Sequence, residues 1–174
     1  MDETSELAAV LFKAMQLERD GHAFYLAAAE RTAAAAGRKM FLSLARDELQ
    51  HLQFLDDYYR RCLAHAAWPA AEVLQREAGR RWPVFPPPAA AGQVVAPNTG
   101  DLEALRQGIA AEQASIELYQ HGLETATDPQ VRALFLLLVQ QEEGHRTILE
   151  GEYDYLTHTG FWFDQPEFDL EAMG

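Results

Sequence analysis

The chain has 174 residues, and 48% of them are hydrophobic, which is enough for one domain around a single core. Its net charge of −13 argues against nucleic acid or an anionic membrane as a partner and favours attraction of cations. We expect a cytoplasmic protein, because no apolar run could cross a bilayer and acidic residues replace a basic leader region. The single cysteine, Cys62, excludes an internal disulfide and the paired CxxC motifs of a rubredoxin-type iron site.

Two helices are predicted in the first part of the chain. Leu11, Glu18 and Tyr25 recur every seven residues, which places them on one helix face. Steps of three or four residues then form a second buried stripe, made of Phe41, Leu44, Glu48, His51, Leu55 and Tyr59. Both predicted helices therefore direct acidic or imidazole groups toward the core.

The position of the turn between these helices is predicted by assuming that Glu18 and Glu48 lie at the same height along the antiparallel pair. Residues at one level of an antiparallel pair lie equally far from the loop, and the midpoint of Glu18 and Glu48 is residue 33. We therefore place the turn at residues 32–34, although composition alone would continue the helix to residue 36 or end it at Gly37.

Residues 66–100 differ in composition from the segments on either side, because six prolines and three glycines interrupt them. Proline removes a backbone donor and breaks regular helix. We predict a long crossover connection that carries one short amphipathic helix near residues 70–80.

The second half repeats the first at an offset of 94 residues. Residues 105–153 align with residues 11–59 without a gap, and the identities include Glu18/Glu112, Tyr25/Tyr119, Glu48/Glu142 and His51/His145. This internal duplication predicts a second hairpin, with its turn near residue 127. There Asp128 can cap the next helix, and Pro129 suits the first helical position.

Two hairpins joined by one long connection predict an all-α, ferritin-like antiparallel four-helix bundle over residues 1–160. Residues 161–174 form an aromatic and acidic C-terminal tail that includes Phe161, Trp162, Phe163 and Phe168. We expect this tail to pack over the bundle or against a second subunit, and the alternative is a peptide recruitment signal.

Each half also supplies one Glu followed thirty residues later by Glu-x-x-His. Glu at i and His at i+3 share a helix face, so both can reach one cation while facing helices add carboxylates. Carboxylate and imidazole suit iron or manganese better than copper or structural zinc. Four buried Glu side chains would repel one another, whereas two divalent cations would balance them. The predicted metal ligands are Glu18, Glu48, His51, Glu112, Glu142 and His145. The alternative is that the Glu residues are surface charges and the His residues are hydrogen-bonded core groups.

Four stretches that contain these residues, 18–25, 47–51, 112–119 and 142–145, resemble the ferritin-like superfamily. Within it the chain is similar to rubrerythrin-related di-iron proteins that lack the rubredoxin domain. The resemblance implies that Glu18, Glu48 and His51 hold one iron and that Glu112, Glu142 and His145 hold the other, with Glu48 and Glu142 bridging. It also implies that Tyr25 and Tyr119 support these carboxylates from outside the ligand set.

The resemblance is incomplete at two points. Rubrerythrins carry a further Glu one turn after the third-helix Glu, but here that position is Ser115. The six-ligand set is therefore closer to bacterioferritin-type ferroxidase centres. The missing rubredoxin domain means that any reduction cycle needs an external electron donor.

His22 could approach the site from one turn beyond Glu18, but its repeat partner is Ile116, so we expect it to lie outside the ligand set.

These observations predict a di-iron carboxylate protein that oxidises ferrous iron, reduces hydrogen peroxide or oxygen, or does both, in iron and oxidative-stress metabolism. Such a protein would be an oxidoreductase, either a rubrerythrin-like peroxidase or a ferroxidase. Manganese could replace iron. The alternatives are a non-catalytic iron storage or delivery protein and a metal-free structural bundle. We also expect a homodimer, in which the long crossover would allow hairpins to be exchanged.

Overall fold

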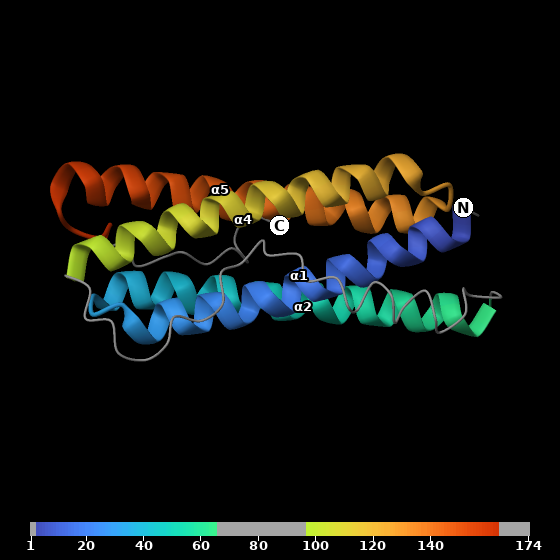
Figure 1. Cartoon of the computed structure of the whole chain (residues 1–174), viewed down its shortest axis with the longest axis horizontal. Coiled ribbons are helices and arrows are strands. Elements are labelled where there is room, and N and C mark those ends of the chain that lie inside the picture. The colour runs from blue at the N-terminus through green and yellow to red at the C-terminus, as the bar shows by residue number, and fades with distance from the viewer. Residues whose placement is uncertain (1–2, 66–96, 164–174) are drawn as a thin grey trace.

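The computed structural model describes residues 3–65 and 97–163, which form long helices (Figure 1). Helices α1 (Glu3–Arg31) and α2 (Ala35–His65) make one antiparallel hairpin, and α4 (Pro97–Thr125) and α5 (Pro129–Thr159) make the other. The two hairpins lie against each other as two layers, with α1 beside α4 and α2 facing α5. The predicted all-α bundle of two hairpins is confirmed.

The two hairpin turns also lie where the duplication placed them. The first turn occupies residues 32–34, so the alanine-rich segment that follows begins a new helix instead of extending α1. In the second turn, Asp128 caps α5 by accepting hydrogen bonds from the backbone N–H groups of Gln130 (2.7 Å) and Val131 (3.4 Å). Pro129 takes the first helical position, where its missing donor costs nothing.

An aligned arginine stabilises each turn. Arg38 donates from Nη2 to the carbonyl of Ala33 at 3.1 Å, and Arg132 donates from Nη1 to the carbonyl of Ala126 at 3.1 Å. These acceptors follow the last turns of α1 and α4, where carbonyl groups lack partners within the helix. The identity of Arg38 and Arg132 in the repeat therefore has a structural reason outside the core.

The core consists of two apolar clusters, and each mixes residues from both hairpins. The first cluster contains Tyr25, Phe41 and Leu44 from one hairpin with Leu105 and Leu149 from the other. The second cluster contains the exchanged set of repeat partners, which are Tyr119, Phe135, Leu138, Leu11 and Leu55. Because each cluster is completed by the opposite half, the duplication gives the bundle an approximate twofold relation.

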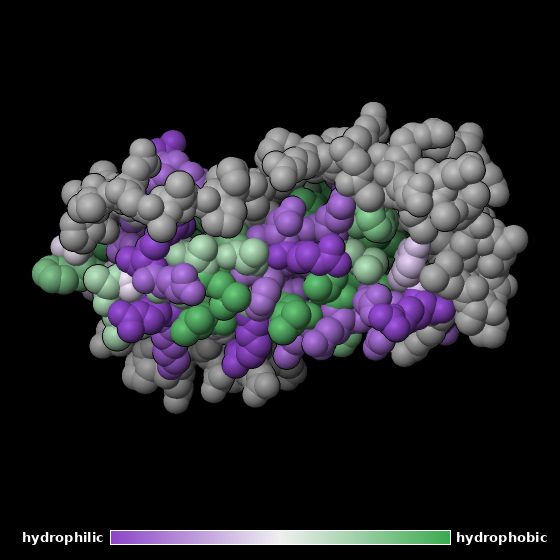
Figure 2. Space-filling model, turned by 60° about the horizontal axis from the view of Figure 1, so that its bottom comes forward, coloured by the Kyte–Doolittle hydropathy of each residue, from purple (hydrophilic) through white to green (hydrophobic). Residues whose placement is uncertain are grey.

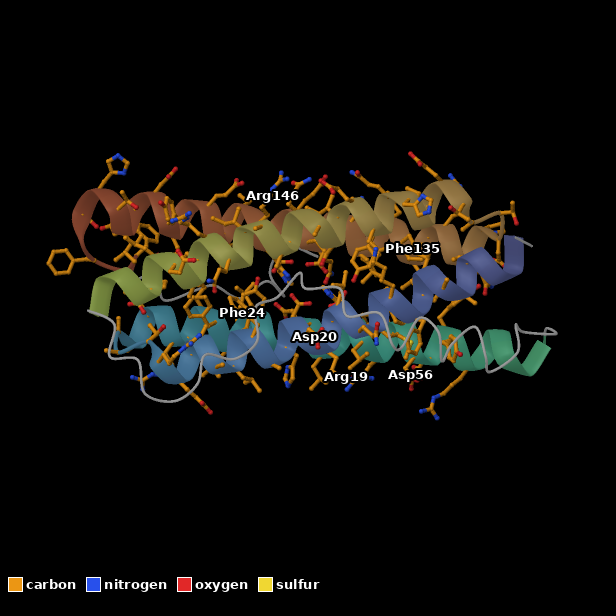
Figure 3. All side chains as sticks on the ribbon, in the orientation of Figure 1. Arg19, Asp20, Phe24, Asp56, Phe135 and Arg146 are labelled. Atoms are coloured by element: carbon orange, nitrogen blue, oxygen red, sulfur yellow. The ribbon has the colours of Figure 1, made fainter. Side chains whose placement is uncertain are left out.

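Side chains divide between this interior and the outer faces as the helical period requires. Phe24 and Phe135 point into the space between the hairpins, whereas Arg19 and Asp56 point away from the bundle (Figure 3). Apolar patches interrupt the polar surface of the α1–α2 side (Figure 2). The exposed large hydrophobic residues of that hairpin are Leu26, Leu42, Leu49 and Phe54. None of the described helices is long and apolar enough to span a membrane.

The beginning of the C-terminal tail packs on one end of the bundle. Trp162 lies edge-to-face against Phe41, with ring centroids 5.7 Å apart, and its indole Nε1 donates to Asp101 at 3.2 Å. A Cβ atom at Gly37 would lie 2.5 Å from this indole, so the small residue makes room for it. Residues 66–96, including the helix predicted at 70–80, and the tail after residue 163 lie outside the described residues. Helix α4 begins at Pro97, inside the range predicted as crossover.

Candidate metal centre

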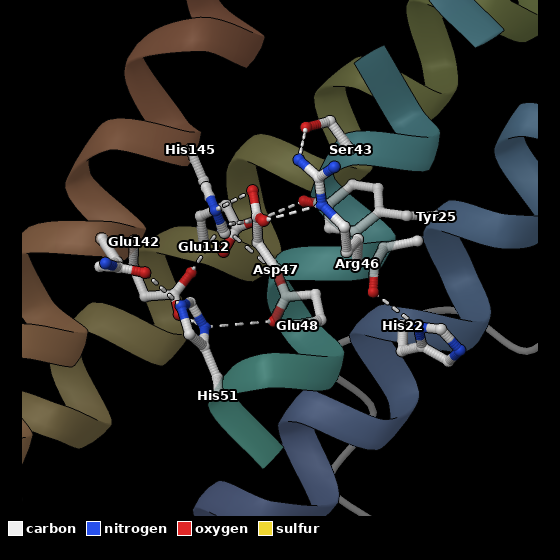
Figure 4. Close-up of polar contacts among 12 residues, drawn as sticks. His22, Tyr25, Ser43, Arg46, Asp47, Glu48, His51, Glu112, Glu142 and His145 are labelled. Atoms are coloured by element: carbon white, nitrogen blue, oxygen red, sulfur yellow. Dashed lines mark hydrogen bonds and ion pairs between the residues drawn. The ribbon is translucent and has the colours of Figure 1, made fainter. Parts of the chain in front are cut away.

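The six predicted ligand residues converge between the two apolar clusters. Figure 4 shows Glu48, His51, Glu112, Glu142 and His145 pointing toward one another. Helices α1 and α4 contribute one Glu each, while α2 and α5 contribute one Glu and one His each. All six side chains are buried, with at most 3% of any residue exposed. They form two overlapping groups: Glu18, Glu48, His51 and Glu142 in one, and Glu48, Glu112, Glu142 and His145 in the other. In each group the potential ligand atoms lie within 4.8 Å of one another.

Both imidazoles present the same ring nitrogen to the carboxylates. His51 Nδ1 lies 2.9 Å from Glu142 Oε1 and 3.4 Å from Glu18 Oε2. His145 Nδ1 lies 3.1 Å from Glu142 Oε2 and 3.4 Å from Glu48 Oε1. The two rings are nearly parallel, with an interplanar angle of 20° and centroids 5.5 Å apart. Glu142 thus contacts both imidazoles, one through each carboxylate oxygen.

The outer nitrogen of each imidazole faces a residue from the opposite hairpin. His51 Nε2 lies 2.7 Å from Gln141 Oε1, within hydrogen-bonding distance, and His145 Nε2 lies 3.7 Å from Asp47 Oδ2. Neither Asp47 nor Gln141 was assigned a role from the sequence. A signal was present, because the two residues are repeat partners that directly precede Glu48 and Glu142.

Two buried tyrosines bind carboxylates across the hairpin interface. Tyr25 donates its hydroxyl hydrogen to Glu112 Oε1, and Tyr119 donates to Glu18 Oε1. Burial raises the pKa of Tyr25, and the neighbouring Glu112 carboxylate raises it further. Burial and Glu18 do the same for the pKa of Tyr119. Both phenols therefore stay protonated donors, which agrees with the supporting role that the resemblance implies.

The crowding of charge shifts the pKa values of the candidate ligands themselves. Burial raises the pKa of Glu48, and the Glu142 carboxylate raises it further. Burial opposes the charged form of His51, but Glu18 and Glu142 outweigh it and raise its pKa above the ordinary value. The pKa of His145 is raised in the same way by Glu142, Asp47 and Glu112. Without a cation, the cluster therefore retains protons, and these protons balance the carboxylate charge that metal ions would otherwise balance.

Several buried atoms of the cluster make His–carboxylate contacts at 2.9 to 3.4 Å but no hydrogen bond of good geometry within the described part of the chain. They are Glu18 Oε2, Glu48 Oε1, His51 Nδ1 and Glu142 Oε1. Buried polar atoms without hydrogen bonds are costly, so an interaction that satisfies them would stabilise the site. Coordination of cations through these atoms would satisfy them, and the mixed oxygen and nitrogen set suits iron or manganese. The residues present therefore fit a two-metal site.

The other residues near the site lie outside the ligand groups. His22 directs Nδ1 at the backbone carbonyl of Ala45, 2.6 Å away, and so links α1 to α2. Ser115 is buried at the position that the extra Glu of rubrerythrins would occupy. Glu117 and Glu143, which neighbour the site in sequence, are exposed. The structure thus groups the six predicted residues and leaves these four outside.

Comparison with known proteins places this architecture in a family. A hypothetical protein from Pyrococcus furiosus has the same fold, with a TM-score of 0.71 and 21% sequence identity over 87% of this chain and 90% of that chain. Curated protein sequences show no significant match. The sequence profile of the family described as Rubrerythrin matches residues 9–153, which contain all six candidate ligands. The chain therefore belongs to the rubrerythrin family.

Proposed function

We propose that the chain is a di-iron carboxylate protein that oxidises ferrous iron and reduces hydrogen peroxide or oxygen. The observation that carries this proposal is the pair of overlapping four-residue groups, which share Glu48 and Glu142 and are buried in the bundle. Two groups that share carboxylates are suited to two adjacent cations with common ligands.

In this proposal, each half of the site contributes one terminal Glu and one His. Glu18 and His51 would hold one ion, Glu112 and His145 would hold the other, and Glu48 and Glu142 would lie between them. Two ferrous ions bound there would supply the two electrons that, together with two protons, reduce one hydrogen peroxide to two waters. The hydroxyls of Tyr25 and Tyr119 restrict the movement of Glu112 and Glu18.

The surrounding protein limits what else reaches the ions. The two apolar clusters close the site along the bundle axis, so bulk water is excluded from the buried carboxylates. The single cysteine cannot build a rubredoxin-type iron site beside the Glu and His cluster. We therefore propose an external electron donor. The homodimer and the cytoplasmic location stay predictions.

Metal analysis and rapid kinetics test the proposal. Protein loaded with ferrous iron without oxygen is expected to bind two ions per chain and to be oxidised rapidly after mixing with peroxide or oxygen. Faster oxidation by peroxide indicates a peroxidase, whereas a comparable rate with oxygen indicates a ferroxidase. Slow oxidation with freely exchangeable iron would instead support iron storage or delivery. Preferential binding of manganese would identify manganese, and not iron, as the metal of the site.

A pair of neighbouring variants separates ligation from general charge. Glu142→Gln removes a shared ligand and is expected to abolish binding of at least one ion, whereas Glu143→Gln removes an exposed charge next to it and should leave two ions bound. Absence of bound metal in the native protein, or unchanged binding in Glu142→Gln, would contradict the di-iron proposal.

A further inference from the structure

The two halves of the candidate site match one for one in their Glu, His and Tyr residues, but they differ behind the imidazoles. Asp47 from α2 faces His145 Nε2 (Figure 4). Its repeat partner Gln141 from α5 faces His51 Nε2. One imidazole is therefore backed by an acidic side chain and the other by a neutral amide. The approximate twofold relation of the fold is broken at this pair of positions.

The outer partner of a metal-bound imidazole influences the inner nitrogen. When Nδ1 binds a cation, the ring proton is on Nε2, and an acceptor there fixes the ring and increases the basicity of the ligand. A carboxylate does this more strongly than an amide oxygen, because it carries negative charge. Its negative charge would also attract a cation held on the inner nitrogen of the same ring.

Asp47 is placed for this role although the imidazole is not yet hydrogen-bonded to it. Its residue is 8% exposed, and Oδ2 is a buried atom with no hydrogen-bond partner among the described residues. The other oxygen, Oδ1, lies 3.7 Å from Nε of Arg46, whose side chain is 55% exposed and well screened by water. His145 Nε2, at 3.7 Å from Oδ2, thus faces an acceptor that is still open.

We infer that the two metal positions are unequal, and that the ion on His145, backed by Asp47, is bound more tightly than the ion on His51, backed by Gln141. This inference rests on the proposed two-metal function. Outer partners of metal-bound histidines contribute about tenfold to a hundredfold to affinity, so the native protein should fill in two distinguishable steps. The tighter step belongs to the half that contains His145.

Exchanging the two outer residues tests the inference. Cobalt(II) is titrated into metal-free protein without oxygen and is followed by visible absorption and calorimetry. In the native background, His145→Ala should remove the tight step and His51→Ala the weak one. In the exchanged variant Asp47→Gln with Gln141→Asp, the assignment should reverse, so that His51→Ala removes the tight step. A purely structural role would lower stability without moving the tight step to the other histidine.

The near-isosteric variant Asp47→Asn covers the case in which the exchanged protein does not fold. It should weaken the tight step at least about tenfold and leave the weak step unchanged. The matched control Glu143→Gln, which removes an exposed charge near the same site, should change neither step. Two equal steps in the native protein, or an unchanged tight step in Asp47→Asn, would overturn the inference. Binding of fewer than two ions by the native protein would instead refute the proposed function.

Discussion

Raising the pH of the metal-free protein is expected to destabilise it, which is the opposite of what ion-paired carboxylates with lowered pKa values usually cause. The pKa values of Glu48, Glu112, His51 and His145 are all raised in the folded state. Between each ordinary pKa and the raised one, the folded chain holds more protons than the unfolded chain. Stability is therefore fully present below the unfolded pKa values, 4.5 for Glu and 6.5 for His, and is lost as pH rises through the folded values.

The size of the effect follows from the number of protons. Each extra proton held by the folded state changes the free energy of unfolding by about 1.4 kcal/mol per pH unit. Near neutral pH the two buried histidines alone can hold up to two, so we expect a loss of about 1 to 3 kcal/mol per pH unit. This is a large fraction of the roughly 5 to 15 kcal/mol that stabilises a typical domain. The lowered pKa of Glu142 acts only below 4.5, where its contribution is lost as pH falls.

Urea denaturation at about pH 6, 7 and 8, with a chelator present and circular dichroism as the signal, measures this slope. The same protein loaded with metal is the control. Metal ligands must lose their protons, so binding tightens as pH rises, and the slope for the loaded protein should change sign or flatten. If the stability of the metal-free protein were constant or increased from pH 6 to 8, the inference that the buried cluster retains extra protons would be refuted.

Further predictions concern the packing and the caps of the bundle. Gly122→Ala should cost about 1 to 3 kcal/mol in urea denaturation, because a Cβ there would lie 2.6 Å from Cζ of the buried Phe135 ring. Gly151→Ala, with nothing within 4 Å of its Cβ, should stabilise helix α5 by about 0.5 to 1 kcal/mol, and equal effects of the two changes would contradict this packing. Asp128→Ala should cost about 1 kcal/mol because two N–H groups lose their acceptor, and Asp128→Asn should restore most of it.

Much of the fold could be predicted from the sequence because the signals are local or repeated. The spacing of apolar residues defines helix faces, and the offset of 94 residues located the first turn where propensity alone would have misplaced it. The same repeat selected Glu18, Glu48 and His51 with their partners as a set, and the structure brings that set together. Their role as metal ligands stays a prediction that the titrations test.

The pairings between hairpins could not be predicted, because a helix period says which face is buried and not which residue lies opposite. Tyr25 and Glu18 lie on one helix, yet each binds a partner from the other hairpin. The contact of Trp162 with Phe41 likewise depends on how the chain turns after α5. These contacts form only when the helices are packed with their residues at matching heights along the bundle, and no single segment of sequence determines that alignment.

The duplicated sequence by itself determined two equivalent hairpins with an equal set of acidic and imidazole groups. Only the tertiary structure decided how the halves combine, because packing them around an approximate twofold relation completes each apolar cluster with residues from the other half. The same packing places Asp47 and Gln141 behind imidazoles of the opposite hairpin. A difference of one charge at matching sequence positions thereby becomes a difference between the two halves of one buried site.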